Sequence, residues 1–150
     1  MAMEKIADVL RRKFPQFNTI KAERSISDAL YQMSCENVDY LIVQDENERF
    51  MGILTEHDIA SKVLTVTKDL DNVIVLEFLT RTLPVATIDD SLEYALQLLE
   101  NHNMKFLAVY DQFTFKGVLS AQDLIKQALS RRQNLFADLQ KHHQGYPWTY

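Results

Sequence analysis

Two short segments of the sequence carry polar side chains in matching order, and they are the best candidates for chemistry. Thr55-Glu56-His57-Asp58 is matched by Ser120-Ala121-Gln122-Asp123, so in both a hydroxyl precedes an aspartate by three residues. At a helix start, free N–H groups and a hydroxyl can bind an anion, and an aspartate can accept both hydrogens of a vicinal diol. Together these groups suit a ribose that carries phosphate.

The same spacing also fits a structural role. A Ser or Thr followed three residues later by an acid is typical of a capping box, in which both side chains stabilise the helix start. The motif occurs twice, each time after a matched glycine, Gly52 or Gly117, and this repetition gives more weight to a binding role. A glycine inside a strand often marks a close approach by a ligand or by another backbone segment. Both interpretations therefore stay open.

Both segments belong to an internal repeat. Residues 25–45 align without a gap on residues 91–111, and GILTEHDI at 52–59 aligns on GVLSAQDL at 117–124. Seven positions are identical in the first alignment: Ser25/Ser91, Ala29/Ala95, Leu30/Leu96, Asn37/Asn103, Leu41/Leu107, Val43/Val109 and Asp45/Asp111.

Each copy predicts the order β-α-β-β-α. Apolar residues at i, i+3, i+4 and i+7 predict helices that begin near residues 26 and 92. Nearly continuous apolar runs predict strands buried on both sides at Tyr40–Val43 and Phe106–Val109. A second strand and a second helix follow in each copy. The fold class is therefore α/β (α+β), with an additional N-terminal helix at 3–13 and a long C-terminal helix at 122–143.

The predicted organisation is one compact module. Residues 1–66 hold the N-terminal helix and the first copy, 67–132 the second copy, and 133–150 a helical extension with an aromatic tail. A copy of about 60 residues buries only about 60% of its unfolded surface, so we expect the copies to pack on each other. Pseudo-twofold symmetry would then leave two equivalent clefts between them.

Composition excludes several classes of protein. The 21 acidic and 16 basic residues give a net charge of −5, which argues against a nucleic-acid binder. The apolar runs are too short to span a membrane, and the charged N-terminus is unlike a signal peptide, so we expect a cytoplasmic protein. The single cysteine, Cys35, allows no internal disulfide and is interpreted as a partly buried apolar residue. No metal site and no catalytic cluster is expected, because the four histidines are scattered.

With these motifs in place, the chain resembles a tandem CBS module over roughly residues 4–130. The resemblance rests on the AL helices, the LIV and LAV strands, and the GILTEHD and GVLSAQD elements. It implies a regulatory module that requires no cofactor and that binds AMP, ATP, S-adenosylmethionine or a similar adenosyl compound. The implied residue roles are ribose binding by Asp58 and Asp123, phosphate contact by Thr55 and Ser120, and lining of the adenine and phosphate pocket by Thr19.

The sequence departs from the family pattern just before each aspartate. Family members that bind several phosphates often have a basic residue there, whereas this chain has His57 and Gln122. Histidine is only partly charged near neutral pH and glutamine is never charged. We therefore favour an AMP-like or uncharged adenosyl ligand over ATP, and we rank the Thr55/Asp58 cleft above the other.

The sequence thus predicts a non-catalytic ligand sensor that forms a homodimer. The alternative is a constitutive dimeric scaffold with no small-molecule ligand, in which the aspartates only cap helices. Phe113 and Phe115, beside the second hairpin turn, are candidate subunit contacts. The tail residues Tyr146, Trp148 and Tyr150 either fold back on the module or across a dimer, or they dock on a protein partner.

Overall fold

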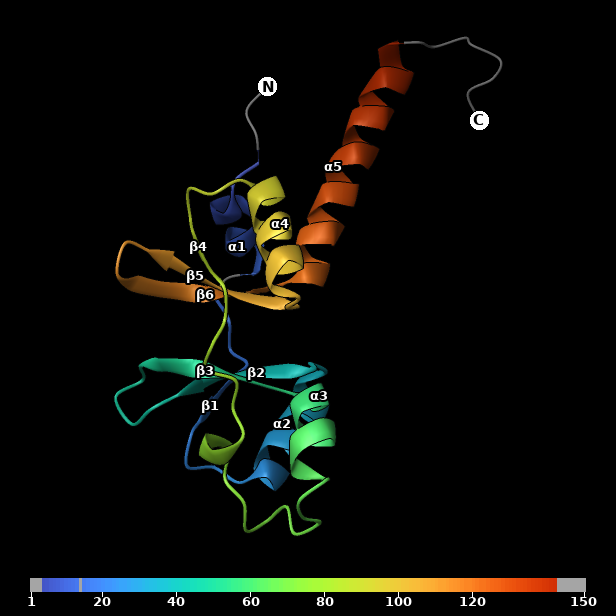
Figure 1. Ribbon diagram of the computed structural model, residues 1–150. Coiled ribbons are helices and arrows are strands. Elements are labelled where there is room, and N and C mark those ends of the chain that lie inside the picture. The colour runs from blue at the N-terminus through green and yellow to red at the C-terminus, as the bar shows by residue number, and fades with distance from the viewer. Residues whose placement is uncertain (1–3, 14, 143–150) are drawn as a thin grey trace. The chain divides into compact units, whose positions relative to one another are not determined.

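The computed structural model describes residues 4–13 and 15–142, with no side-chain description for 131–138 and 140–142. The chain divides into two units, one of residues 14–83 and one that joins residues 1–13 to residues 84–150. Each unit contains a three-stranded mixed sheet with helices against it (Figure 1). The predicted α/β class is confirmed. The aromatic tail residues Tyr146, Trp148 and Tyr150 lie outside the described residues.

The unit of residues 14–83 holds the first repeat. Its elements are β1 (Thr19–Lys21), α2 (Ile26–Glu36), β2 (Tyr40–Gln44), β3 (Phe50–Thr55), α3 (Glu56–Asp58), a π-helical turn (Ile59–Val63) and a 3-10 turn (Val75–Glu77). β2 lies between the other strands, parallel to β1 and antiparallel to β3. The helices cover one face of this sheet (Figure 1).

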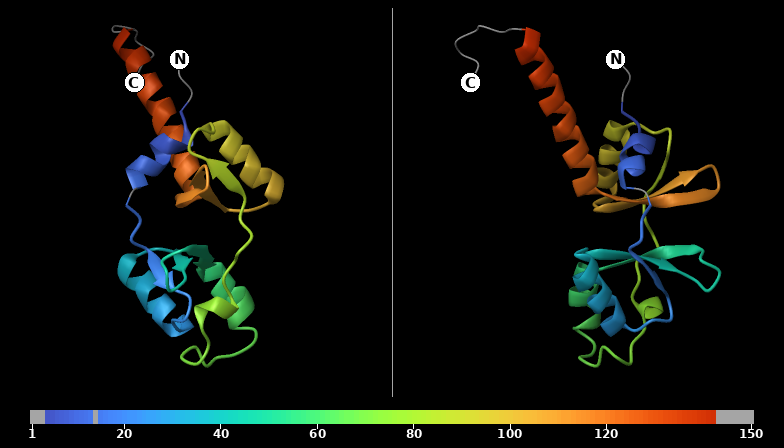
Figure 2. Two further views of the ribbon diagram at one scale, coloured as in Figure 1. Left: turned by 90° about the vertical axis from the view of Figure 1, so that its left-hand side faces the viewer. Right: turned by 180° about the vertical axis from the view of Figure 1, so that it is seen from behind.

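The other unit repeats this topology. Its elements are α1 (Ile6–Lys13), β4 (Val85–Thr87), α4 (Leu92–His102), β5 (Phe106–Asp111), β6 (Thr114–Ser120) and α5 (Ala121–His142). β5 is central, parallel to β4 and antiparallel to β6. Helices α1 and α5 lie side by side in this unit (Figure 2). Helix α5, at Ala121–His142, corresponds to the long helix that the sequence predicts for 122–143.

The central strands have apolar residues on both faces, as predicted. Leu41 and Val43 of β2 pack in the core against the helices, whereas Ile42 belongs to the opposite face and is also buried. In β5, Leu107 and Val109 belong to the helix-side core and Ala108 to the other face. The alternation follows from the two-residue period of a strand.

Helix α1 packs on the second repeat, although the sequence grouped it with the first. Ile6, Val9 and Leu10 belong to the core of the unit that holds β4–β6. The segment that precedes the second repeat instead packs on the first, where Val75 is fully buried. An apolar helix face specifies that the helix is buried but not its partner, so the periodicity could not reveal this arrangement.

The identities between the repeats have structural roles. Ser25 and Ser91 are N-caps whose hydroxyls accept from backbone N–H groups at 3.0 and 3.1 Å. Asn37 and Asn103 end the same helices in the left-handed conformation, which asparagine tolerates better than most residues. The repeated sequence thus encodes helix boundaries.

The matched glycines lie at matched β-bulges. Gly52 and Gly117 pair with Val43 and Val109, next to a register shift in each sheet. Gly52 has φ +155°, and a Cβ placed there would lie 2.2 Å from the backbone oxygen of Thr80. The close approach expected at Gly52 is therefore made by the chain's own backbone.

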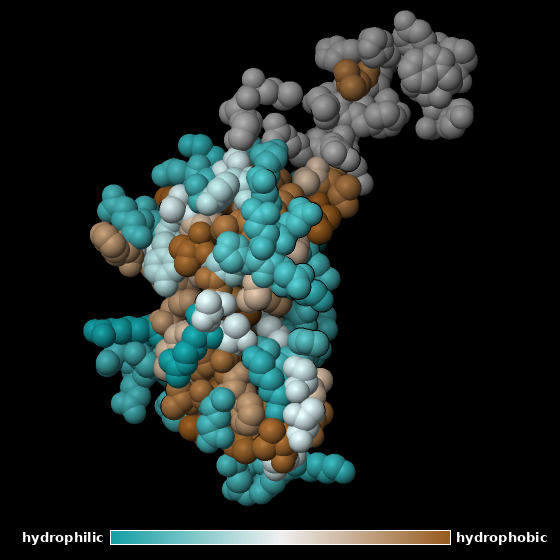
Figure 3. All heavy atoms as spheres, viewed as in Figure 1, coloured by the Kyte–Doolittle hydropathy of each residue, from teal (hydrophilic) through white to brown (hydrophobic). Residues whose placement is uncertain are grey.

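The surface differs between the two hairpin tips. The β2–β3 tip is hydrophilic, whereas the β5–β6 tip also presents an apolar side chain (Figure 3). Phe113 is 100% exposed there, while Phe115 is half-buried and packs edge-on against Tyr110 at 5.7 Å between ring centroids. Cys35 is exposed rather than partly buried, because it lies on the side of α2 away from the core. Among the described helices, none has the length and apolarity needed to span a bilayer.

Candidate functional site

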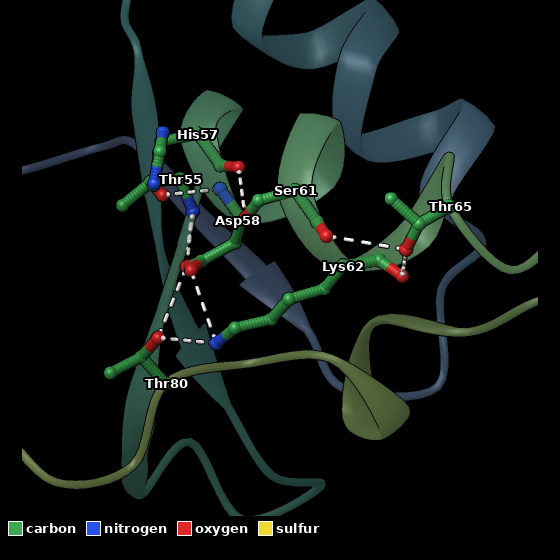
Figure 4. Close-up of polar contacts among 7 residues, drawn as sticks. All are labelled: Thr55, His57, Asp58, Ser61, Lys62, Thr65 and Thr80. Atoms are coloured by element: carbon green, nitrogen blue, oxygen red, sulfur yellow. Dashed lines mark hydrogen bonds and ion pairs between the residues drawn. The ribbon is translucent and has the colours of Figure 1, made fainter.

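The Thr55/Asp58 element forms a reciprocal capping box at the junction of β3 and α3 (Figure 4). The Thr55 hydroxyl accepts from the backbone N–H of Asp58 at 2.9 Å. In return, Oδ2 of Asp58 accepts from the backbone N–H of Thr55 at 3.2 Å. The capping role that the sequence allowed is therefore present.

The Asp58 carboxylate has further partners that the sequence motif did not indicate. Lys62, one helical turn later, places its Nζ 3.2 Å from Oδ1. The Thr80 hydroxyl donates to Oδ2 at 3.1 Å and lies 3.4 Å from Nζ of Lys62 (Figure 4). Asp58 is 7% exposed and is the one buried charged residue in the described part of the chain. Both oxygens of its carboxylate thus have partners within its own unit.

The Ser120/Asp123 element has the same capping geometry at the start of α5. The Ser120 hydroxyl accepts from the backbone N–H of Asp123 at 3.1 Å, and Oδ2 of Asp123 accepts from the N–H of Ser120 at 2.9 Å. Nζ of Lys13, at the end of α1, donates to the same Oδ2 at 2.6 Å. The Asp123 side chain is 27% exposed, and Oδ1 has no partner among the described contacts. Asp123 is therefore the more accessible of the two carboxylates.

The remaining predicted residues make no contact with the aspartate side chains in the described part of the structure. His57 and Gln122 are exposed, each directly before its aspartate. Thr19 begins β1 and is half-buried, and its backbone oxygen accepts from the side chain of Gln32 at 2.8 Å. The Gly117 backbone has φ +155°, like that of Gly52.

The sequence motifs did not predict the three side chains that contact the carboxylates, Lys62, Thr80 and Lys13. Lys62 could have been found, because an acid and a lysine four residues apart face each other on a helix. Thr80 and Lys13 carry no such signal, since they lie 22 and 110 residues from their aspartates. Thr80 and Lys13 reach the aspartates only because the segments that precede each repeat pack against the sheets.

The groups in these two elements can bind a polar ligand through hydrogen bonds and ion pairs. Each element offers a carboxylate acceptor, a hydroxyl and one ammonium group, which suit a diol and a single negative charge. No cluster of three or more His, Cys, Asp or Glu side chains suited to a metal occurs among the described residues.

A family model, the CBS domain, matches residues 6–65 and 75–130. The chain is 27% identical over 122 residues to a homoserine O-acetyltransferase of Methanococcus vannielii, covering 81% of this chain and 24% of that protein. The chain thus spans about a quarter of the length of the first curated relatives it matches.

Solved structures share the fold. The chain is 28% identical to the CBS domain NE2398, with a TM-score of 0.76, covering 85% of this chain and 99% of that one. It is 23% identical to the hexameric CBS-CP12 protein of a bloom-forming cyanobacterium, with a TM-score of 0.69, covering 83% of this chain and 71% of that one.

Proposed function

Because this chain belongs to the CBS-domain family and carries the domain twice, we propose that it is a non-catalytic regulatory module that binds an adenosyl ligand. An AMP-like ligand is favoured, and S-adenosylmethionine is the alternative without phosphate. Binding would shift the conformations available to the module and so change its affinity for a partner protein.

The observation that carries the proposal is the matched pair of elements. Thr55/Asp58 and Ser120/Asp123 each follow a bulged strand with a glycine and present the same hydroxyl and carboxylate at a helix start. A cap needs only the hydroxyl. The matching position is Tyr94 at α4, and at α2 it is Asp28, which is half-exposed and pairs with its neighbour Arg24. Asp58 and Asp123 instead contact side chains from distant segments, Thr80 and Lys13, which a cap does not require.

The two elements differ in what a ribose diol would displace. At Asp123 the diol would meet Oδ1, which has no partner among the described contacts. At Asp58 it would compete with Lys62 or Thr80. The sequence ranked Asp58 first, and these contacts give a reason to test Asp123 with equal effort.

The charge paired directly with each aspartate supports a ligand with little negative charge. Within the described contacts, one ammonium group pairs with each carboxylate, Lys62 with Asp58 and Lys13 with Asp123. A ligand with three phosphates would need several more cations to offset its charge.

A thermal-shift panel of AMP, ADP, ATP, S-adenosylmethionine and NADH tests the proposal. A ligand at 100 times its dissociation constant should add about 2.7 kcal/mol of stability. AMP should raise the melting temperature more than ATP at equal concentration. No shift with any of the five compounds would refute ligand binding and leave the scaffold interpretation.

A constitutive scaffold is the second candidate, and the exposure of Phe113 is the observation that favours it. A fully exposed phenylalanine at a hairpin tip is a plausible subunit contact, and we propose a homodimer for this chain under either function. The relative with CBS-CP12 architecture is hexameric, so assembly occurs among proteins with this fold. Sedimentation velocity on Phe113→Ser and on a chain truncated after Lys141 would test which segment holds the dimer. Loss of partner binding upon truncation, with no ligand effect, would favour the scaffold.

A further inference from the structure

A surface pocket lies between helices α1 and α5, within the unit that holds the second repeat. It has a volume of about 480 Å³ and is lined by Val9, Arg12, Lys13, Asp123, Lys126, Gln127 and Ser130. Pockets that hold small molecules are commonly about 300–1,000 Å³. This pocket therefore has the size of a small-molecule site.

The pocket walls are held in place by a nearly buried carboxylate. Glu4, whose side chain is 12% exposed, accepts at Oε1 from Arg12 at 3.0 Å and from Gln127 at 2.7 Å. The Lys13–Asp123 pair at 2.6 Å also joins the two helices. These contacts already join the two helices, which lowers the entropy cost of binding.

The charge of the lining favours an anion. Arg12, Lys13 and Lys126 supply three cations against the single carboxylate of Asp123, which Lys13 already pairs. Lys126 is exposed and has no partner among the described contacts. The Arg12 guanidinium has five N–H donors, of which the described contacts use one on Glu4. Arg12 and Lys126 can therefore both turn donors toward an anionic group.

The rest of the lining suits hydroxyl groups rather than a flat ring. Gln127, Ser130 and Asp123 offer donors and acceptors, and Val9 is the single aliphatic residue. No aromatic side chain lines the pocket, so a purine would find nothing to stack on.

We propose that the α1/α5 pocket binds a small, hydroxyl-bearing organic phosphate of the sugar-phosphate class, with the phosphate between Arg12 and Lys126. The hydroxyl groups then face Gln127 and Ser130. The pocket borders Asp123, which the adenosyl proposal also uses, but Arg12 and Lys126 belong to neither Ser/Thr-x-x-Asp element. Occupancy would hold α1 against α5 by bridging the two helices.

Titration of the ¹⁵N-labelled full chain with ribose 5-phosphate, followed by amide chemical shifts, tests the proposal. We expect saturable shifts at α1 and at the first turns of α5. Lys126→Gln should weaken binding by roughly tenfold, since it removes one charge-assisted hydrogen bond. Lys116→Gln removes an exposed cation from β6, outside the pocket lining, and should leave the affinity unchanged. Arg12→Gln gives a second, independent loss.

Neutral ribose and sodium chloride at matched ionic strength separate a site from general charge screening. Shifts of equal size with either control, or no saturable shift with ribose 5-phosphate, would overturn the proposal. Wild-type affinity in both Lys126→Gln and Arg12→Gln would overturn it as well. The Asp58 element of the adenosyl proposal belongs to the other unit and is followed by its own amide signals, whereas loss of binding in Lys126→Gln and Arg12→Gln assigns a shift near Asp123 to this pocket.

Discussion

Replacement of Gly52 by alanine is the sharpest test of why this glycine is repeated. The added Cβ would lie 2.2 Å from the backbone oxygen of Thr80 and 2.8 Å from Cδ1 of Leu79. Both distances are well below van der Waals contact, and the nearer atom is backbone, which cannot rotate away. The segment at Thr80 would therefore have to leave β3.

The cost of this displacement can be worked out from two parts. Thr80 and Ile53 exchange two backbone hydrogen bonds, of 3.0 and 2.7 Å, each worth about 1 kcal/mol. A non-glycine residue at φ +155° adds strain of order 1–3 kcal/mol. Gly52→Ala should therefore destabilise the protein by about 3–5 kcal/mol, a large share of a typical domain stability of about 5–15 kcal/mol.

Urea unfolding followed by circular dichroism measures this difference. Thr80→Ala is the matched control, because it keeps both backbone bonds and loses only the hydroxyl contacts with Asp58 and Lys62; it should cost about 1 kcal/mol. If Gly52→Ala costs less than about 1 kcal/mol, the backbone approach does not explain the glycine. The space beside Gly52 would then be available to a ligand, as the sequence pattern allowed.

Three further predictions concern the caps, the core and the turn. Asn103→Ala should lower the free energy of unfolding by about 1 kcal/mol, because alanine is strained in the left-handed conformation at φ 51°. Urea unfolding measures this change, and an unchanged midpoint would contradict the prediction. Leu119→Ala should cost about 2–5 kcal/mol in the same assay, since Leu119 is 0% exposed, and a cost below about 1 kcal/mol would show that the site is not core. The backbone hydrogen bond from Arg49 lowers the pKa of Asp45, so its stabilising effect is present above the ordinary aspartate pKa and is lost as pH falls through the lowered value. A carboxyl NMR titration should therefore place the pKa of Asp45 below the ordinary aspartate value, and a midpoint at or above that value would refute the turn geometry.

The sequence predicted the elements well because the repeat supplied each signal twice. The apolar helix faces that begin near residues 26 and 92 and the apolar runs at Tyr40–Val43 and Phe106–Val109 all act locally. Local signals of this kind are readable without knowledge of the tertiary structure.

Contacts between distant segments could not be predicted from the sequence. The placement of α1 on the second repeat, and with it the Lys13–Asp123 pair, depends on packing across 110 residues. Thr80 reaches Asp58 only because its segment pairs with β3. The exposure of Cys35 was misjudged for a related reason, since residue type alone does not decide which side of α2 faces the core.

The central claim is that the two matched aspartates bind an adenosyl ligand, and calorimetric titration with AMP tests it most directly. Asp58→Asn and Asp123→Asn keep an oxygen that can cap the helix but remove the charge that binds a diol. Ser91→Ala removes a cap outside both elements and controls for lost stability. The account predicts saturable AMP binding that at least one of the two asparagine variants weakens by about tenfold or more, with Ser91→Ala unchanged. Absence of AMP binding to the wild-type chain, or full affinity in both asparagine variants, would contradict it.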